Sequence, residues 1–201
     1  MTERPDDART LKRELRAHAR NRRKRQPDKD GLSRRICRRL ASLPEYERAA
    51  MVMFYVDFAS EVRTRQFLPA AWEAGKRVVV PFCAGDELEL FRIESMEELA
   101  EGSYGILEPT EAIRSRRERR VDAAQLDLIV VPGLAFDCHG GRLGQGKGYY
   151  DRLLRTVRPD ATVIALAFEC QLFPAVPMRP NDVYVHKVIT EAAVYDNPTA
   201  K

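Results

Sequence analysis

The chain has 201 residues, of which 44% are hydrophobic and 32% are charged, and its formal net charge at pH 7 is +4. This length predicts a single domain over residues 1–201 with a sizeable core, and no apolar run approaches the ~20 residues that span a bilayer. Because residues 1–7 also lack the apolar core of a secretory signal, we expect a cytoplasmic protein with no membrane segment.

The first part of the chain is predicted to be helical and strongly basic. An apolar stripe that includes Leu11 and Leu15 predicts a helix over residues 8–25, and a second helix is expected over residues 32–40. Residues 1–40 hold 15 Lys and Arg against 6 Asp and Glu, a balance of +9, and the remainder holds 19 against 24, a balance of −5. A basic end attracts nucleic acid, a membrane surface or a small polyanion, and composition does not choose among them.

A strand, a helix and a second strand are expected next. Residues 49–56 form a continuous apolar run of strand length, residues 62–74 have a helical pattern that ends at Gly75, and residues 76–81 are a second apolar run. This order predicts a right-handed parallel crossover.

The middle of the chain is more irregular. We expect a strand over residues 88–93 and a helical turn over residues 96–99. The run of charges at residues 114–120 is interpreted as a solvated loop or helix face, although a nearby anion could recruit one of its arginines.

Strands and helices alternate again in the last third of the chain. Strands are predicted over residues 128–133, 161–167 and 183–189, with a helix over residues 149–157, and residues 196–201 are expected to be frayed. Runs that are apolar on both faces indicate a mainly parallel, twisted α/β sheet with helices on both sides, a three-layer, Rossmann-like arrangement. Ligands of such folds bind outside the carboxyl ends of the strands, where a glycine-rich loop follows the first of these strands.

The four cysteines give no sign of a metal site or of a catalytic thiol. They are widely scattered and form no C-x-x-C pair, so we expect no zinc. Cys138 and His139 are a conceivable nucleophile and base, but neighbours in sequence seldom face each other.

Residues 140–148 hold five of the eleven glycines and have the outline of a phosphate site. The spacing from Gly141 to Lys147 is that of a Walker A loop, but Gly148 stands where that motif needs Ser or Thr to bind Mg²⁺, and there is no G-x-G-x-x-G fingerprint. A forked donor from Arg142, a point charge from Lys147 and free backbone N–H groups at a helix start would still hold an anion.

Several of the neighbouring residues have more than one interpretation. Asp151 offers hard oxygen ligands to Mg²⁺, or else it complements the helix dipole while the glycines form a structural turn. Lys12 and Arg16 share a helix face and could bind phosphate jointly, although such pairs are more often solvated. Tyr149 and Tyr150 point in different directions, so one can pack into the core while the other meets a ligand.

Taken together, residues 12–16, residues 131–137 leading into residues 142–152, and Asn181 with Asp182 resemble the 5-formyltetrahydrofolate cyclo-ligase family, also called methenyltetrahydrofolate synthetase. The resemblance spans nearly the whole chain. Its central motif is long and specific. The K-x-x-L-R and N-D pieces are short, and they support the resemblance through their order and position in the chain. The fold of this family resembles the sugar-phosphate isomerase and CoA-transferase superfamily.

The resemblance implies an enzyme that uses ATP and Mg²⁺ to convert 5-formyltetrahydrofolate into 5,10-methenyltetrahydrofolate, with release of ADP and phosphate. Transfer of the γ-phosphoryl group to the formyl oxygen would create an imidate phosphate, which N10 of the folate attacks as phosphate departs. Positioning and charge neutralisation would be the main tasks of the protein, which is expected to be a monomer that binds neither membrane nor nucleic acid.

The family pattern also assigns roles to individual residues. It implies Arg142 and Lys147 as catalytic residues and Asp151 and Asp182 as the Mg²⁺ ligands. The residues implied to bind the nucleotide are Lys12, Arg16, Arg142, Leu143, Gly144, Gln145, Gly146, Lys147, Gly148, Tyr149 and Tyr150. Those implied to bind the folate are Arg16, Val56, Glu61 and Tyr150.

The sequence departs from the family pattern at two positions, and two other functions are alternatives to the one implied by the resemblance. Gln145 stands where the family commonly has Arg or Tyr, and His186 where an acidic residue is common, so the contacts of those side chains are not carried over. An isomerase or CoA-transferase-like enzyme would need no ATP, since fold does not fix chemistry. A nucleic-acid-binding module would use the basic amino-terminal helices, where aromatic residues are scarce.

Overall fold

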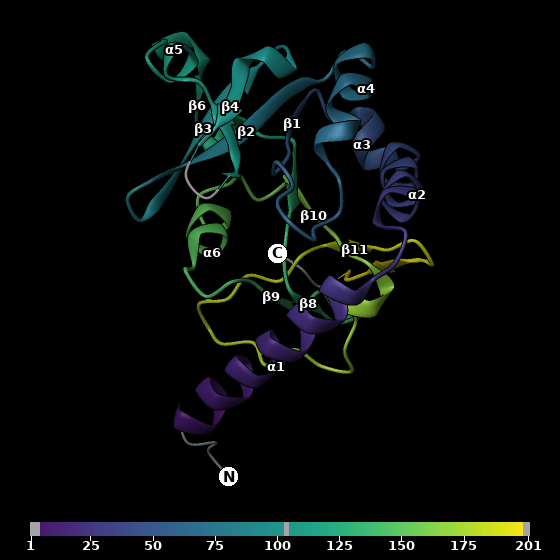
Figure 1. Cartoon of the computed structure of the whole chain (residues 1–201). Helices are drawn as coiled ribbons and strands as arrows, with labels where there is room; N and C mark the ends of the chain where they lie inside the picture. Colours follow the sequence, from purple (N-terminus) through teal and green to yellow (C-terminus); the bar gives the residue numbers. More distant parts are fainter. Residues whose placement is uncertain (1–4, 103–104, 199–201) are drawn as a thin grey trace.

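The computed structural model describes residues 5–102 and 105–198, and most of its strands join one eight-stranded mixed sheet (Figure 1). In spatial order these strands are β12 (Val194–Asp196), β11 (Lys187–Ile189), β10 (Thr162–Leu166), β7 (Leu128–Val131), β1 (Met51–Met53), β2 (Arg77–Ala84), β3 (Glu87–Ile93) and β6 (Arg120–Val121). The five strands from β11 to β2 are parallel to one another, whereas β12, β3 and β6 are antiparallel additions at the edges. The predicted mainly parallel α/β sheet is therefore confirmed.

Helices cover both faces of this sheet. The α-helices of the described residues are α1 (Pro5–Arg25), which lies apart from these faces, α2 (Lys29–Ala41), α3 (Pro44–Arg48), α4 (Leu68–Glu73), α5 (Glu111–Arg114) and α6 (Tyr149–Leu154). Figure 1 shows α2, α3 and α4 on one side of the strands and α6 on the other. Alternate side chains of β1 accordingly enter different cores, because Val52 packs with Ile36 and Leu68 while Met53 packs with Leu153. None of the helices described is long and apolar enough to cross a membrane.

The first helix lies outside these two layers. Ala19 on α1 is fully buried against Leu134 and Leu143, which belong to the segment of the small β8 (Ala135–Phe136) and β9 (Arg142–Leu143) ladder. A second small ladder joins β4 (Leu99–Glu101) and β5 (Leu107–Pro109). Both ladders and α1 thus surround the strand ends rather than extend the main sheet.

Most predicted elements correspond to observed ones. The helices expected at residues 8–25 and 32–40 are α1 and α2, each beginning three residues earlier, and the helix expected at 149–157 is the shorter α6. The predicted strands at 76–81, 88–93, 128–133 and 161–167 are β2, β3, β7 and β10. The parallel crossover between β1 and β2 is also confirmed.

Three expectations about boundaries are wrong, and each error follows from a loop that serves the strand ends. The strand predicted at 49–56 stops at Met53, and the helix predicted at 62–74 is reduced to a 3₁₀ turn (Arg65–Phe67) and α4. Between them lies a loop, because the side chains of Thr64 and Asp57 form hydrogen bonds with backbone groups there. The strand predicted at 183–189 begins only at Lys187, since the N–H of Val185 donates to the carbonyl of Gly140.

The carboxyl terminus holds a strand that was not predicted. Asp196 was expected to be frayed, but it belongs to β12 and pairs with Lys187 of β11. Residues 199–201 lie outside the described residues. The strand is short and only partly buried, so its sequence carries little apolar signal.

The arginine run at 114–120 is only partly a solvated face. Arg119 is buried, and its guanidinium forms ion pairs with Glu94 at 2.8 Å and Glu98 at 3.0 Å. The solvated interpretation is therefore wrong for this residue, because its acidic partners lie more than twenty positions away in the chain.

Hydrogen bonds to the side chain of Asp127 help to hold the parallel strands in register. Its carboxylate accepts the N–H groups of Ala50 at 2.8 Å and Met51 at 2.7 Å, at the start of β1, and pairs with Arg158. Burial alone would raise the pKa of Asp127, but these N–H groups and Arg158 outweigh it and lower the pKa.

We expect Asp127→Ala to lower the free energy of unfolding by about 1–3 kcal/mol, because two N–H groups lose their acceptor. The effect should be full above the ordinary pKa of an aspartate and should shrink as the pH falls through the lowered pKa, since the native carboxylate is then protonated. Urea denaturation across pH measures this. Asp160→Ala, at a carboxylate that is 77% exposed, is the control, and an equal loss in both variants would contradict the role of Asp127.

Candidate active site

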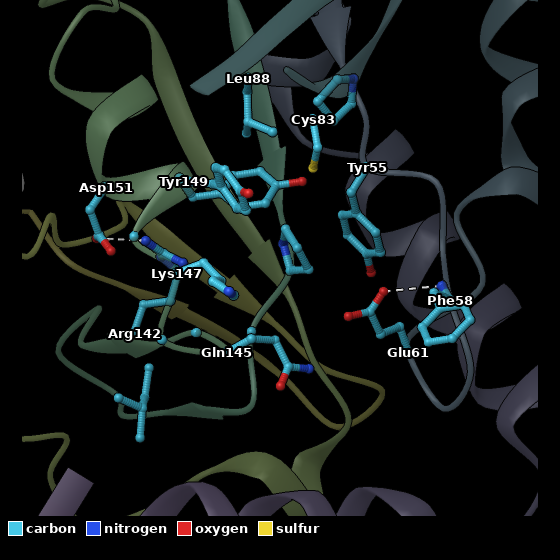
Figure 2. A pocket seen from close by; sticks show the side chains of 18 of the residues that line it. Tyr55, Phe58, Glu61, Cys83, Leu88, Arg142, Gln145, Lys147, Tyr149 and Asp151 are labelled. Carbon is cyan, nitrogen blue, oxygen red and sulfur yellow. Dashed lines mark hydrogen bonds and ion pairs between the residues drawn. The ribbon is translucent and has the colours of Figure 1, made fainter. Parts of the chain in front are cut away.

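A pocket of about 670 Å³ lies at the carboxyl ends of β1, β2 and β7. Its walls come from the loop after β1, the end of β2, the glycine-rich loop, the start of α6 and the face of α1 that crosses this edge (Figure 2). This is the place where ligands of parallel α/β sheets bind, and the volume is that of a site for small molecules.

The pocket brings together every site residue that the sequence predicted. Lys12 and Asp182, which are 170 positions apart, touch each other there. The predicted residues that line it are Lys12, Arg16, Val56, Glu61, Arg142, Leu143, Gly144, Gln145, Gly146, Lys147, Gly148, Tyr149, Tyr150, Asp151 and Asp182. Neither Cys138 nor His139 lines it, so the structure gives no support to a cysteine nucleophile.

The glycine-rich loop has a backbone that only glycine adopts easily. Gly146 has a φ of 104° and Gly148, which begins α6, has a φ of 73°. Arg16 reaches this loop from α1, and its Nε donates to the carbonyl of Gly144 at 3.0 Å. The loop is therefore tied to α1 where it lines the pocket.

Asp137 anchors the base of this loop. Its buried carboxylate accepts the N–H groups of His139 at 2.9 Å, Gly141 at 2.8 Å and Val176 at 2.8 Å. A Cβ at Gly141 would lie 2.3 Å from that carboxylate, which explains why glycine stands there. The motif contains Asp137, but its sequence gave no sign that it ties the loop to the segment after β10.

The two predicted metal ligands are each paired with a cation. Asp182 pairs with Lys12, and Asp151 pairs with Arg142 at 2.7 Å. The N–H of Val183 donates to Asp151 at 3.3 Å, so the backbone directly after Asp182 lies against Asp151. The Nε of Arg142 is buried and finds no hydrogen-bond acceptor within the described residues.

These carboxylates fit Mg²⁺ rather than a metal held by protein alone. The described residues contain no cluster of three or more His, Cys, Asp and Glu side chains. Mg²⁺ is commonly held by one or two carboxylates, with phosphates and water completing its six ligands. Asp151 and Asp182 meet that requirement if phosphate oxygens are supplied by a nucleotide.

Lys147 differs from the paired cations. It is exposed, lines the pocket, and its ammonium group makes no ion pair with any residue that the structure describes. Its charge is therefore available to an anion without breaking an existing contact.

The opposite end of the pocket is formed by the turn at residues 58–61. Figure 2 shows Glu61 and Phe58 on the far side from Asp151 and Arg142. The N–H of Phe58 donates to Glu61 at 3.1 Å, and Arg23 approaches the same carboxylate at 3.5 Å. Burial raises the pKa of Glu61, and Arg23 opposes this rise.

The two adjacent tyrosines both line the pocket, so the expectation that one would serve only the core is too simple. The hydroxyl of Tyr149 donates to the carbonyl of Gly85 at 2.9 Å. Tyr150 packs against both cores of the sheet and burial raises its pKa, so it is a neutral phenol that serves packing and pocket together.

Several residues that line the pocket were not predicted from the sequence. Arg9 shares a helix face with Lys12 and Arg16, and this spacing could have revealed it. Tyr55 and Phe58 follow β1 directly, and a position beyond the carboxyl end of a parallel strand is also a usable signal. Arg179 had no local signal. The other residues missed are Pro81, Cys83, Leu88, Ile106, Leu107, Glu108, Pro132 and Gly133.

The two departures from the family pattern have local partners. Gln145 accepts a hydrogen bond from Arg20 at 2.9 Å, so a second helix cation reaches the loop at this point. The Nδ1 of His186 accepts the N–H of Val163 at 3.0 Å, which gives it a role in the sheet.

Comparison with known proteins identifies relatives along most of the chain. The model of the 5-formyltetrahydrofolate cyclo-ligase family matches residues 5–191. A probable 5-formyltetrahydrofolate cyclo-ligase of Schizosaccharomyces pombe is 32% identical, over 84% of this chain and 88% of its own. The Escherichia coli K12 5-formyltetrahydrofolate cyclo-ligase is 31% identical, over 79% and 87%. The structure of Aquifex aeolicus 5,10-methenyltetrahydrofolate synthetase is similar with a TM-score of 0.81 and 34% identity, covering 95% of each chain.

We expect Gly146→Ala to weaken ATP binding about tenfold, because a side chain at this φ costs about 1–3 kcal/mol unless the loop rearranges. Gly144→Ala is the matched control in the same loop, since its backbone is ordinary and its Cβ would have no neighbour nearer than 3.4 Å. Isothermal titration calorimetry with ATP and Mg²⁺ compares them. Equal affinities for the two variants would show that the loop conformation does not matter for the nucleotide.

Proposed function

The chain belongs to the 5-formyltetrahydrofolate cyclo-ligase family, and we propose that this pocket converts 5-formyltetrahydrofolate into 5,10-methenyltetrahydrofolate with ATP as phosphoryl donor. One observation carries the assignment of the site: the residues of the family pattern, scattered from Lys12 to Asp182, all line a single pocket. That pocket is polar and cationic at one end and holds Glu61 and Phe58 at the other (Figure 2).

The proposed reaction has two steps. The formyl oxygen attacks the γ-phosphorus of ATP, the bond between this phosphorus and the bridging oxygen breaks, and ADP leaves. N10 then attacks the formyl carbon of the resulting imidate phosphate and loses its proton, and the carbon–oxygen bond breaks to release phosphate. Ring closure thus uses phosphate as the leaving group in place of an oxide, which is a very poor one.

The cations of the pocket are proposed to carry the charge of the transferred group. Arg142 and Lys147 lie on the glycine-rich loop and are proposed as the catalytic pair, because both are cations that line the pocket and Lys147 makes no ion pair with the described residues. Lys12 and Arg16 add charge from α1. The N–H groups of residues 144–148 complete the phosphate site at the start of α6.

Asp151 and Asp182 are the residues that would hold Mg²⁺. When bound, this ion supplies positive charge to the β- and γ-phosphate oxygens as ATP reacts. Both carboxylates are neutralised by Arg142 and Lys12 in the structure described, so we infer an exchange of partners in which the released cations turn to the phosphates. This exchange keeps the buried Arg142 partnered with and without nucleotide.

The folate is proposed to occupy the other end of the pocket. Val56 and Glu61 follow β1, and Tyr150 and Arg16 also line the pocket. Phe58 is 40% exposed there and offers a ring face to an aromatic ligand. Productive binding requires the formyl oxygen to lie next to the γ-phosphate, where the two ends of the pocket meet.

The remaining expectations belong to this proposal. We propose one domain, a monomer, and a cytoplasmic location, with folate and ATP as ligands rather than a membrane or nucleic acid. The rival isomerase or transferase reaction needs no ATP, and the likeness to that superfamily remains a prediction.

The unmodified protein should form 5,10-methenyltetrahydrofolate from 5-formyltetrahydrofolate only when ATP and Mg²⁺ are both present. Loss of the 5-formyl absorbance and gain of the methenyl absorbance measure this directly, with coupled detection of ADP. EDTA and a non-hydrolysable ATP analogue serve as controls. Turnover without ATP would overturn the mechanism.

Asp151→Asn and Asp182→Asn should change ATP binding in opposite directions with and without metal. Each variant removes a negative charge beside the phosphates and releases a cation, so metal-free ATP should bind several-fold more tightly, while Mg²⁺-ATP should bind about tenfold more weakly. Titrations in EDTA and in Mg²⁺ distinguish the two. Asp160→Asn is the control on an exposed carboxylate, and parallel losses in both conditions would argue against metal binding at these residues.

A further inference from the structure

Arg23 is a buried cation of α1 that the proposed reaction does not use. It is 4% exposed, whereas neighbours on the same helix such as Lys24 and Arg25 are exposed. A buried guanidinium is costly unless its donors are satisfied. The partners of Arg23 therefore indicate what the residue does.

Those partners belong to two different walls of the pocket. The Nε of Arg23 donates to the hydroxyl of Ser60 at 3.1 Å, and its Nη1 lies 3.5 Å from a carboxylate oxygen of Glu61. The same Nη1 donates to the carbonyl of Gly133 at 3.0 Å, directly after β7. One side chain thus ties α1 to the turn after β1 and to the end of the neighbouring strand.

The turn that Arg23 holds has a strained backbone. Ala59 has a φ of 52°, a left-handed conformation that is costly for a residue with a Cβ. The turn is closed by the N–H of Glu61, which donates to the carbonyl of Phe58 at 3.1 Å, and by the N–H of Phe58, which donates to the Glu61 carboxylate. Such a conformation persists when surrounding contacts fix it, and Arg23 bonds to the two residues that follow Ala59.

We propose that Arg23 is the positioning residue for Glu61, whose carboxylate it directs into the folate end of the pocket. The inference rests on the proposed function, since Glu61 is assigned there to the folate. Arg23 itself need not touch the substrate. The pterin ring carries N–H donors, and an ionised, fixed carboxylate accepts from them more strongly than a neutral carboxyl group.

The charges around Glu61 support this role. Burial raises the pKa of Glu61, and Arg23 is the cation paired with it, so Arg23 and the Phe58 N–H act to lower that pKa. Asp57 acts to raise it, but it is itself 3.5 Å from Arg63 and from Arg65.

The remaining groups that face Glu61 are phenols. Tyr55 and Tyr150 have pKa values raised above the ordinary range, chiefly by burial, so both stay neutral at physiological pH. Loss of Arg23 would therefore leave Glu61 without a paired cation among the described residues.

The test compares Arg23→Gln with Arg22→Gln, a change at the adjacent arginine, whose guanidinium stacks on Phe173 at 4.9 Å instead. For Arg23→Gln we expect the KM for 5-formyltetrahydrofolate to rise about tenfold, with the KM for ATP nearly unchanged. The acid limb of kcat/KM for the folate should move to higher pH, because the pKa of Glu61 rises when Arg23 is lost. Arg22→Gln should behave like the unmodified protein.

Two further variants keep the test decisive if Arg23→Gln folds poorly. Arg23→Lys keeps the charge but not the forked donors. Compared with Arg23→Gln, it should return the acid limb of kcat/KM most of the way to that of the unmodified protein, and it should recover only part of the affinity for 5-formyltetrahydrofolate. Glu61→Gln should abolish the acid limb, and adding Arg23→Gln to it should shift nothing further.

Equal rises in both KM values without a shift in the pH profile would overturn the inference and leave Arg23 a packing residue. Failure of the proposed function is distinguishable, because the unmodified protein would then form no 5,10-methenyltetrahydrofolate at any pH. Calorimetric titration with 5-formyltetrahydrofolate alone, across pH, gives the same comparison without turnover.

Discussion

The ion pair between Lys12 and Asp182 joins the two ends of the chain, and the pocket depends on contacts of this kind. The central sheet is built from local βα units and is complete without α1, but it leaves the carboxyl ends of β1, β2 and β7 open on one side. The long helix α1 closes that side with little apolar surface of its own, chiefly through Ala19. Polar contacts from Lys12, Arg16 and Arg23 therefore fix where the helix lies, and so fix the shape of the site.

The cationic side chains of a polyanion site must also be stabilised when the anion is absent. Arg142 is almost fully buried, and an unpaired guanidinium in that position would cost several kcal/mol. Pairing with Asp151 offsets this cost, and Asp151 is also one of the two carboxylates proposed to hold Mg²⁺. The same holds for Lys12 and Asp182 on the other wall. On the proposed mechanism, the same two carboxylates neutralise buried cations in the structure described and would hold Mg²⁺ when the nucleotide binds.

The sequence predicted the parallel sheet well, because β7, β10 and β2 are apolar on both faces and alternate with helices. It also indicated that the glycine loop can bind phosphate, because the charged residues and glycines of this loop are neighbours in the chain. The predicted strand at 49–56 was too long because apolar residues continue past Met53 to line the pocket. Arg23 and Arg119 were not recognisable, since an arginine in a basic run gives no sign of burial until its distant acceptors are known. Contacts across segments, and not local propensity, decide those positions.

The concentration of positive charge in residues 1–40 acquires a specific meaning from this arrangement. Four cations follow one face of α1 and each has a partner at or beside the pocket: Lys12 with Asp182, Arg16 with Gly144, Arg20 with Gln145, and Arg23 with Glu61. Their spacing of three or four residues is that of a helix face. A generic polyanion-binding tail would leave its cations without partners, whereas these side chains contact three separate loops, and Lys12 and Arg23 are buried. Four of the nine Lys and Arg residues of α1 thus belong to one wall of a site whose other walls are the glycine loop and the turn that presents Glu61.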